Sequence, residues 1–268
     1  MIKWILRVSV VFFIWWTNNL PIMAQDKELI FLSYNIYHGE DPYQPGKSNI
    51  QDIAELIKRI RPDLIALQEV DSMTNRTRGF NEGERKNLVM ELEKATGLKG
   101  FFAKAIDFSE GGYGEAILSR YPAEFEKVQL PIPKGGEERS MAIAHVNLPD
   151  GSKLSFAATH LCHQFEENRT AQAAAISDLL SGLQVPVVLA GDFNFESDEK
   201  GYSVLSKDFK DAALEFGNIQ ETYSSKTPEI RIDYFWLDRN TKWEIISMEA
   251  LDVEFSDHKP IVITIKIR

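Results

Sequence analysis

The chain has 268 residues and a formal net charge of −10, and 44% of its residues are hydrophobic. That length fits one large domain with a substantial core, and no linker, repeat or low-complexity tract divides it. The acidic balance disfavours a protein that coats nucleic acid by neutralising phosphates. The single cysteine, Cys162, excludes an intramolecular disulfide.

The N-terminus has the order of a secretory signal peptide. Lys3 and Arg7 give a basic start, residues 5–16 are mostly apolar, and a small residue, Ala24, precedes a polar stretch. We therefore predict that residues 1–24 are a signal peptide and that the protein is periplasmic or secreted. An uncleaved N-terminal membrane anchor is the alternative, although the apolar stretch is short for a span. We expect no membrane span after processing, and a monomer.

The first part of the domain reads as strand, helix and strand. Residues 29–37 are mostly apolar at both odd and even positions until Asn35, which suits a strand buried on both faces. Ser48-Asn49-Ile50-Gln51 predicts a capping-box helix start, and Arg61-Pro62 ends the helix. A second buried strand follows over residues 64–70. A helical crossover predicts that these two strands are parallel.

The pattern of predicted secondary structure changes in the middle of the chain. Residues 71–83 are polar and predict a loop, and residues 84–96 predict a helix. Four segments with strand character then follow, and Pro149-Asp150-Gly151 predicts a hairpin between the last two. The predicted strands are residues 101–108, 113–119, 141–148 and 153–161.

A helix over residues 168–180 leads into Val187-Val188-Leu189-Ala190, a short apolar run typical of a strand buried on both faces. Gly191-Asp192-Phe193-Asn194 follows directly, and in an extended chain Asp192 and Asn194 would project to the same side. Three further strands close the chain, over residues 231–237, 243–251 and 260–267. Two α/β halves with a meander between them predict two packed sheets with helices outside.

Polar residues stand where the apolar strands end. Each of them alone could cap a turn or satisfy a neighbouring backbone group. Their recurrence after separate buried strands instead predicts one pocket, because strand ends of a packed sheet converge. The residues are Asn35, Glu69, His160, Asp192, Asn194, Asp233, Asp257 and His258.

These residue types suit metal-assisted hydrolysis at phosphorus. Glu69 and Asp257 are hard oxygen ligands and Asn35 offers a carbonyl oxygen, a sparse set that suits Mg²⁺ better than Zn²⁺. A histidine beside an aspartate suits general-base catalysis, and a carboxylate partner should raise the histidine pKa while leaving the other nitrogen unprotonated at neutral pH. Arg139 and His160 could hold anionic oxygens.

Seven short motifs occur in an order that resembles the endonuclease/exonuclease/phosphatase superfamily, whose members include DNase I, inositol-polyphosphate 5-phosphatases and neutral sphingomyelinases. The resemblance runs from about Leu29 to the C-terminus, so we predict residues 25–268 as one such domain, of a bacterial exported member. The motifs are Tyr34-Asn35-Ile36, Leu67-Gln68-Glu69-Val70, Ala116-Ile117-Leu118-Ser119-Arg120, Thr159-His160-Leu161, Gly191-Asp192-Phe193-Asn194, Arg231-Ile232-Asp233-Tyr234 and Ser256-Asp257-His258-Lys259-Pro260.

The resemblance implies a DNase I-like fold: a four-layer α/β/β/α sandwich of two packed mixed β-sheets, with the site at one edge. It also implies roles for the strand-end residues. Glu69, with Asn35 and Asp257, resembles the Mg²⁺ site, with Mn²⁺ as an alternative ion. His258 resembles the base that acts on water, oriented by Asp233, and Asp192 with Asn194 resembles the pair that positions nucleophile and phosphoryl oxygens. His160 and, more loosely, Arg139 resemble phosphate contacts.

One position departs from the superfamily pattern. Close bacterial relatives tend to have asparagine where this chain has Glu115. The extra carboxylate could hydrogen-bond His160 and raise its pKa, or it could point outward without a role. Cys162 shares strand parity with His160 and could face the pocket, but a buried, inert thiol is the interpretation that we favour.

We therefore expect a Mg²⁺-dependent hydrolase of phosphate esters, either a phosphodiesterase or a phosphatase, acting on a small-molecule or lipid head-group phosphoester. A secreted endonuclease or exonuclease is the alternative, which the acidic chain and the lack of a basic, aromatic-interleaved insertion disfavour. A non-catalytic binding module of the same fold is the third hypothesis. A decayed enzyme should have lost site residues, and here they are all present.

Overall fold

The computed structural model describes residues 28–268, so the predicted signal peptide lies outside the described residues. Two six-stranded sheets form the centre of the molecule. In the first sheet β1 and β2 are parallel neighbours and the other neighbouring pairs are antiparallel. Its strands, in spatial order, are β11 (Trp243–Ala250), β12 (Ile261–Ile267), β1 (Leu29–Asn35), β2 (Leu64–Ser72), β4 (Gly111–Ser119) and β3 (Lys99–Phe108).

The second sheet repeats this plan. Its strands β7 and β8 are parallel, joined by the crossover helix α4 (Glu166–Ser181), and its other pairs are antiparallel. In spatial order the strands are β5 (Ala123–Gln129), β6 (Ser140–Asn147), β7 (Lys153–His160), β8 (Val187–Asp192), β10 (Asp233–Asp238) and β9 (Phe209–Asp211). Each sheet therefore has one parallel pair at its centre.

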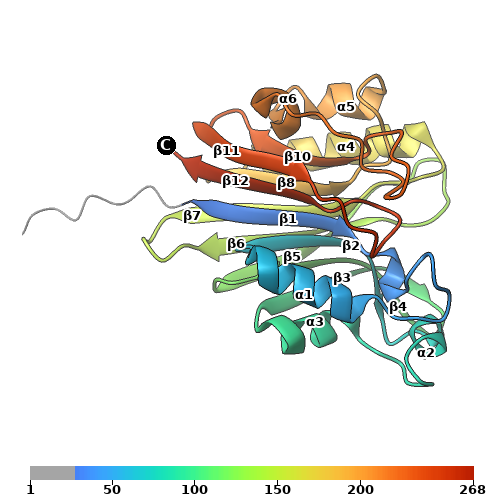
Figure 1. Cartoon of the computed structure of the whole chain (residues 1–268). Helices are drawn as coiled ribbons and strands as arrows, with labels where there is room; N and C mark the ends of the chain where they lie inside the picture. The colour runs from blue at the N-terminus through green and yellow to red at the C-terminus, as the bar shows by residue number, and fades with distance from the viewer. Residues whose placement is uncertain (1–27) are drawn as a thin grey trace, which may run out of the picture.

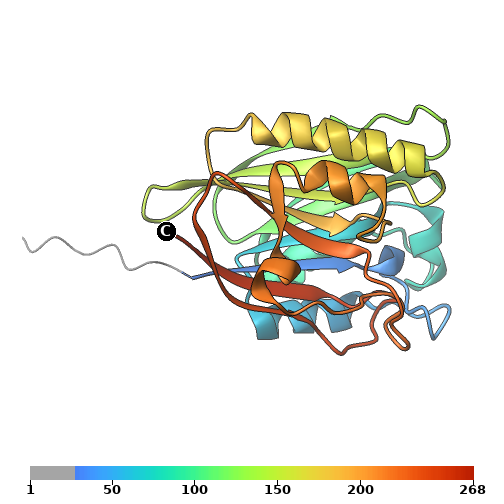
Figure 2. The same ribbon diagram turned by 90° about the horizontal axis from the view of Figure 1, so that it is seen from above.

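Helices cover the two outer faces, which gives the predicted four layers (Figure 1). Helices α1 (Ile50–Ile60) and α3 (Leu88–Thr96) lie on the first sheet, and α4 with α5 (Lys200–Leu205) lies on the second. Figure 2 shows α4 running along the strands of its sheet. Shorter helical turns are η1 (Tyr37–Gly39), α2 (Asn75–Gly79) and α6 (Ala212–Phe216). Within residues 28–268, no helix is both long and apolar enough to cross a membrane.

Three apolar clusters hold the layers together. Between the sheets, Phe31 of β1 packs on Phe156 of β7 with ring centroids 5.3 Å apart. The buried side of α1, including Ile53 and Ile57, packs on the outer face of the first sheet, and Ile176 of α4 packs on the second. Burying a large apolar side chain contributes about 1.5–3 kcal/mol, so these layers provide the main stabilisation.

Helix α1 has the predicted residues, but its start differs from the prediction. No capping box forms: the N-cap is Asn49, whose side chain makes no cap hydrogen bond and whose Nδ2 shares its two hydrogens among the carbonyl oxygens of Ile36, Glu40 and Phe255, at 2.7–3.0 Å. Asn49 thus ties the loop after β1 to the loop before β12, two segments that surround the site. At the other end Arg61 adopts a left-handed conformation (φ 58°) before the proline, which stops the helix.

Other element boundaries also moved. Helix α3 starts at Leu88 rather than at Glu84, capped by the Asn87 side chain, and the predicted loop after β2 contains helix α2. The predicted parallel pairing of the first two strands and the hairpin between β6 and β7 are confirmed. Strands β5 and β9 and helices α5 and α6 were not predicted.

Candidate active site

The carboxyl ends of β1, β2, β7 and β8 lie on the side of the molecule opposite the start of β1 and the C-terminus (Figure 1). In the second sheet, His160, Asp192 and Asp233 occupy one row across three neighbouring strands, because Asp192 is the register partner of both others. Gly191 permits this close packing, since a Cβ there would lie 2.0 Å from the carbonyl oxygen of Thr159. Strand packing therefore requires the glycine that precedes Asp192.

Asp192 is the buried centre of the site. Its Oδ1 accepts a hydrogen bond from the backbone N–H of Asn194 at 2.9 Å, and its Oδ2 accepts one from Asn35 Nδ2 at 3.1 Å. The same Oδ2 lies 3.4 Å from His160 Nε2 and 3.6 Å from His258 Nε2. Burial raises the pKa of Asp192 to about 7, against the opposing effect of the His258 charge.

His258 and Asp233 form a buried pair, with Nδ1 2.9 Å from Oδ2. The ring also packs on Tyr223, at 4.9 Å between ring centroids. Burial lowers the pKa of His258, but Asp233 and Asp192 outweigh that effect and raise it to about 10. This corrects the expectation of an unprotonated nitrogen at neutral pH, since the sequence did not place a second carboxylate against the ring.

Glu69 reaches the site because β2 is distorted there. Its backbone is left-handed (φ 56°), and the pairing of β2 with β4 shifts register between Leu67 and Val70. Such a bulge re-aims a strand side chain. Burial opposes its ionisation, but nearby His38 and Asn35, with His160 and His258, hold the pKa of Glu69 below its usual range.

Asn35 differs from its predicted role as a metal ligand. Its Oδ1 accepts from the backbone N–H of Tyr37 at 3.2 Å, and its Nδ2 donates to Glu69 Oε1 and Asp192 Oδ2, both at 3.1 Å. The amide therefore presents N–H groups to the site, because the tight turn at Tyr37 uses the oxygen. The amide nitrogen of Asn35 therefore holds the carboxylates of Glu69 and Asp192 in place, and the amide oxygen bonds the backbone.

The donor set fits a divalent cation. Asp257 lines the same cavity as Glu69, and its pKa is raised by burial and then by the Glu69 charge, against the effect of His258. A hard divalent cation neutralises carboxylates that repel each other in this way. Asp192, Asp233 and His258 also have ligand atoms within 4.8 Å of one another, and Oδ1 of Asp233 is buried without a hydrogen-bond partner among residues 28–268. A cation on that second cluster would compete with the imidazole proton.

Arg139 lines the cavity, yet its nitrogens face histidines. Its Nη1 is 2.8 Å from His160 Nδ1, and its Nη2 is 3.0 Å from His163 Nδ1 and 2.9 Å from Glu137 Oε1. Burial and then the Arg139 charge hold the pKa of His160 well below its usual range. The predicted direct contact between Arg139 and phosphate thus competes with existing hydrogen bonds.

Asn194 lies in the cavity, although not as an extended chain would place it. Strand β8 ends at Asp192, and Asn194 is left-handed (φ 51°) with its Nδ2 donating to the carbonyl oxygen of Leu161 at 3.1 Å.

Glu115 neither bonds His160 nor points outward, the two alternatives that the sequence left open. Its side chain is fully buried between the sheets and accepts a hydrogen bond from Ser140. Cys162 is buried and does not line the cavity.

The cavity at this edge has a volume of about 430 Å³. Sequence analysis missed several of its residues, including Glu137, His163 and Tyr223. His163 stands three residues after His160, and that spacing was the available signal. The cavity is lined by Glu69, Tyr113, Glu137, Arg139, His160, His163, Asp192, Asn194, Tyr223, Ile230, Ile232, Asp257 and His258.

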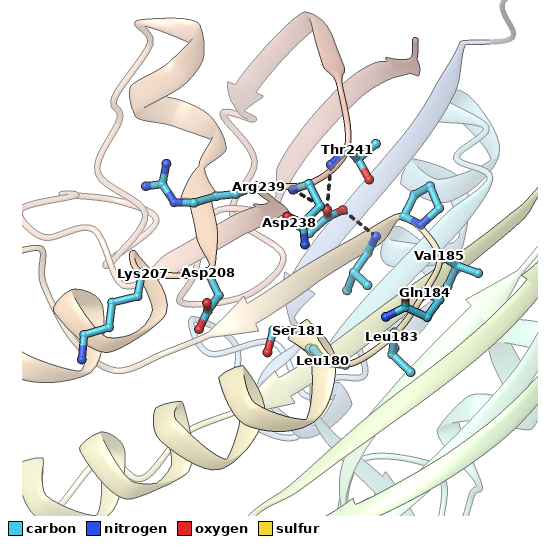
Figure 3. Close-up of a pocket in the computed structure, with 13 residues that line it drawn as sticks. Leu180, Ser181, Leu183, Gln184, Val185, Lys207, Asp208, Asp238, Arg239 and Thr241 are labelled. Carbon is cyan, nitrogen blue, oxygen red and sulfur yellow. Dashed lines mark hydrogen bonds between the residues drawn. The ribbon is translucent and has the colours of Figure 1, made fainter.

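A larger hollow of about 500 Å³ lies at the other end of β8 (Figure 3). Its central carboxylate, Asp238, accepts from the backbone N–H groups of Val187, Asn240 and Thr241 at 2.9–3.0 Å. These bonds satisfy the carboxylate and join β8 to the turn after β10. Size alone therefore does not identify the site, and the convergent titratable groups of the smaller cavity do.

Comparisons with known proteins agree with this geometry. Residues 32–258 match the model of the Endonuclease/Exonuclease/phosphatase family. The chain is 26% identical over 188 residues to the uncharacterized protein YbhP of Escherichia coli K12, covering 65% of this chain and 70% of that protein.

Two solved structures show the same fold. A functionally unknown conserved protein from Enterococcus faecalis V583 superposes with a TM-score of 0.74 at 20% identity, covering 90% of this chain and 100% of the other. The mannosyl-6-phosphatase of Bacteroides thetaiotaomicron VPI-5482 superposes with a TM-score of 0.71 at 17% identity, covering 88% and 99%. With a family match over most of its length and the family's fold, the chain belongs to the endonuclease/exonuclease/phosphatase family.

Proposed function

We propose that this protein is a Mg²⁺-dependent hydrolase of small phosphate esters, with a water molecule activated by the His258–Asp233 pair. The observation that carries the proposal is the buried cluster of Asp192, His258 and Asp233 beside a cavity that is also lined by three further carboxylates, Glu69, Glu137 and Asp257. Family membership supports phosphoester chemistry, and a phosphatase is among the proteins of the same fold.

In its neutral form, His258 accepts the proton of the attacking water through Nε2, while Asp233 holds Nδ1 and stabilises the imidazolium that results. Asp192 Oδ2 lies 3.6 Å from Nε2 and pairs with it once that nitrogen is protonated. A divalent cation held by Glu69 and Asp257 would polarise a phosphoryl oxygen and offset the negative charge that raises the pKa of His258. His160 has an Nε2 directed at Asp192 and can donate to a phosphoryl oxygen from there.

A small substrate fits better than a nucleic acid. The cavity volume of about 430 Å³ is in the range of small-ligand sites. The chain carries 40 acidic against 30 basic residues, and an acidic surface repels a long polyanion. A sugar phosphate or a phospholipid head group meets less of this repulsion.

The test is hydrolysis by the purified protein with Mg²⁺ and with excess EDTA. The substrates are nitrophenyl phosphate, bis(nitrophenyl) phosphate, hexose phosphates, sphingomyelin and plasmid DNA. We expect small esters to be cleaved with Mg²⁺ only, and His258→Ala to lose the activity. The control is His145→Ala, because His145 lies on β6 outside the cavity. Preferential cleavage of plasmid DNA, or equal rates for both variants, would contradict the proposal.

We also propose that the protein is exported after loss of residues 1–24, on the basis of the basic, apolar and small-residue order of its N-terminus. N-terminal sequencing of protein from its native envelope or medium should begin at or near Gln25. A sequence that starts at Met1 would show that the segment is retained.

A further inference from the structure

Arg139 is a buried guanidinium whose hydrogen bonds are made to two imidazole rings. Its side chain is 2% exposed, with Nη1 directed at His160 Nδ1 and Nη2 shared between His163 Nδ1 and Glu137. Arginine is always protonated and has no acceptor atom, so an imidazole nitrogen facing it must be the acceptor. Both histidines are therefore neutral rings with their hydrogen on Nε2.

The two Nε2–H groups are placed differently. That of His160 is buried and lies 3.4 Å from Asp192 Oδ2. His163 is exposed at the cavity wall, and within residues 28–268 its Nε2 makes no hydrogen bond or ion pair. The His163 backbone is also held, because Arg169 donates to its carbonyl oxygen at 3.4 Å and pairs with Glu199. The ring is thus held through Nδ1 and the backbone through its carbonyl oxygen, while His163 Nε2 has no hydrogen-bond partner among residues 28–268.

We propose that His163 is a substrate contact that binds a phosphoryl oxygen through Nε2–H. Arg139 is the positioning residue for both imidazoles. As a consequence, the site favours phosphomonoesters. A diester has two non-bridging phosphoryl oxygens and a monoester has three. A donor additional to His160 and the cation site therefore benefits the monoester most. This inference rests on the proposed hydrolysis of phosphate esters and specifies the substrate class.

The arrangement also explains how an acidic chain can bind a phosphate dianion. Glu137 accepts from Arg139 at 2.9 Å and offsets its charge, so the phosphoryl group meets neutral N–H donors rather than an open guanidinium. Neutral donors with fixed geometry can bind oxygens without attracting polyanions from a distance. The purely structural alternative is that His163 only satisfies the arginine and never touches substrate.

The kinetic test compares nitrophenyl phosphate with bis(nitrophenyl) phosphate in the Mg²⁺-loaded protein. His163→Phe removes the donor and keeps a ring, so KM for the monoester should rise about 10- to 100-fold with kcat little changed, while the diester changes less than about 3-fold. His163→Gln, which keeps an N–H near the Nε2 position, should recover part of the loss. His145→Phe is the matched control, since His145 also bonds through Nδ1, to Ser155 Oγ at 3.0 Å.

Nitrogen NMR of histidine-labelled protein gives a readout that does not depend on turnover. We expect neutral Nε2–H signals for both rings, and a shift of the His163 Nε2 signal when inorganic phosphate is added with Mg²⁺. Arg139→Lys should return the rings to mixed tautomers with the circular dichroism spectrum unchanged. An Nδ1–H or charged His163, a phosphate titration that leaves it unmoved, or equal losses for monoester and diester would overturn the inference. Absence of all phosphoester hydrolysis, with the tautomers as expected, would instead refute the proposed function.

Discussion

Glu115 offers a sharp test of the energetics of this fold, because it is a fully buried carboxyl between the two sheets. Oε1 has no hydrogen-bond partner in the described part of the chain. Oε2 meets the hydroxyl of Ser140, which also contacts the carbonyl oxygen of Ala103 at 3.1 Å. One serine hydrogen cannot serve two acceptors, so a protonated Glu115 that supplies its own hydrogen satisfies both contacts. Burial raises the pKa of Glu115 from 4.5 to about 8, although Ser140 and Arg139 favour the charged form.

A raised carboxyl pKa in the folded state fixes the sign of the pH dependence. The contribution of Glu115 to stability is fully present below the unfolded pKa and is lost as pH rises through the folded pKa. Glu115→Gln keeps the shape and removes the titration, so the variant should gain stability relative to the parent as pH rises. With the folded pKa at about 8, the gain between pH 6 and pH 9 is about 2–3 kcal/mol.

The assay is urea unfolding of both proteins at pH 6, 7.5 and 9, read as the difference in free energy of unfolding at each pH. The difference cancels titrations that the two proteins share. Glu124→Gln is the control, because Glu124 is an exposed residue on β5 and its loss tests a surface charge alone. A flat difference for Glu115→Gln across this range would refute the reasoning that burial keeps this carboxyl neutral.

Three further predictions concern the site and its frame. Glu69→Ala should lower kcat/KM by at least about 100-fold with partial rescue by high Mg²⁺ or Mn²⁺, and full activity of the parent in excess EDTA would contradict a metal role. His258→Ala should lower kcat by about 10²–10⁴-fold, and Asp233→Asn should lower kcat to a similar extent. The kcat of the double variant should be little lower than that of His258→Ala, and losses that multiply would show that the two residues do not act as a unit. Asp238→Ala frees three backbone N–H groups and should cost about 2–4 kcal/mol in urea unfolding with kcat unchanged, whereas an equal loss of kcat would show that the far end of β8 is coupled to the site.

The sequence predicted the elements whose hydrophobic patterns are strong. Helix α1 was predicted because an apolar stripe and a proline define it, and β8 was predicted because it begins with four apolar residues. Strand β5 was missed because glutamates alternate with partly buried residues at the sheet edge. Strand β9 is only three residues long and forms through its pairing with β10. Such elements depend on their neighbours rather than on local pattern.

The candidate site shows the same division. The strand-end rule identified Glu69, His160, Asp192, Asp257 and His258, each of which follows a buried strand, but it missed Glu137 and His163 of the same cavity. It could not orient them. The amide of Asn35 is turned by the backbone of Tyr37, and the charge on His258 depends on Asp192, which is 66 positions away in the chain. Glu115 could not be placed from sequence, because its hydroxyl partner belongs to the opposite sheet.

The position of β12 has a consequence for how the protein is made. This strand lies between β1 and β11, so Leu29 pairs with Ile265 across more than 200 residues, and the two ends of the folded chain run side by side (Figure 2). During synthesis β1 keeps an open edge until the final strand emerges, and His258 arrives with that strand. Closure over such a distance is slow compared with local structure formation. In a refolding experiment, enzymatic activity should therefore return after helical dichroism, and it reports arrival of the last strand rather than formation of the sheets.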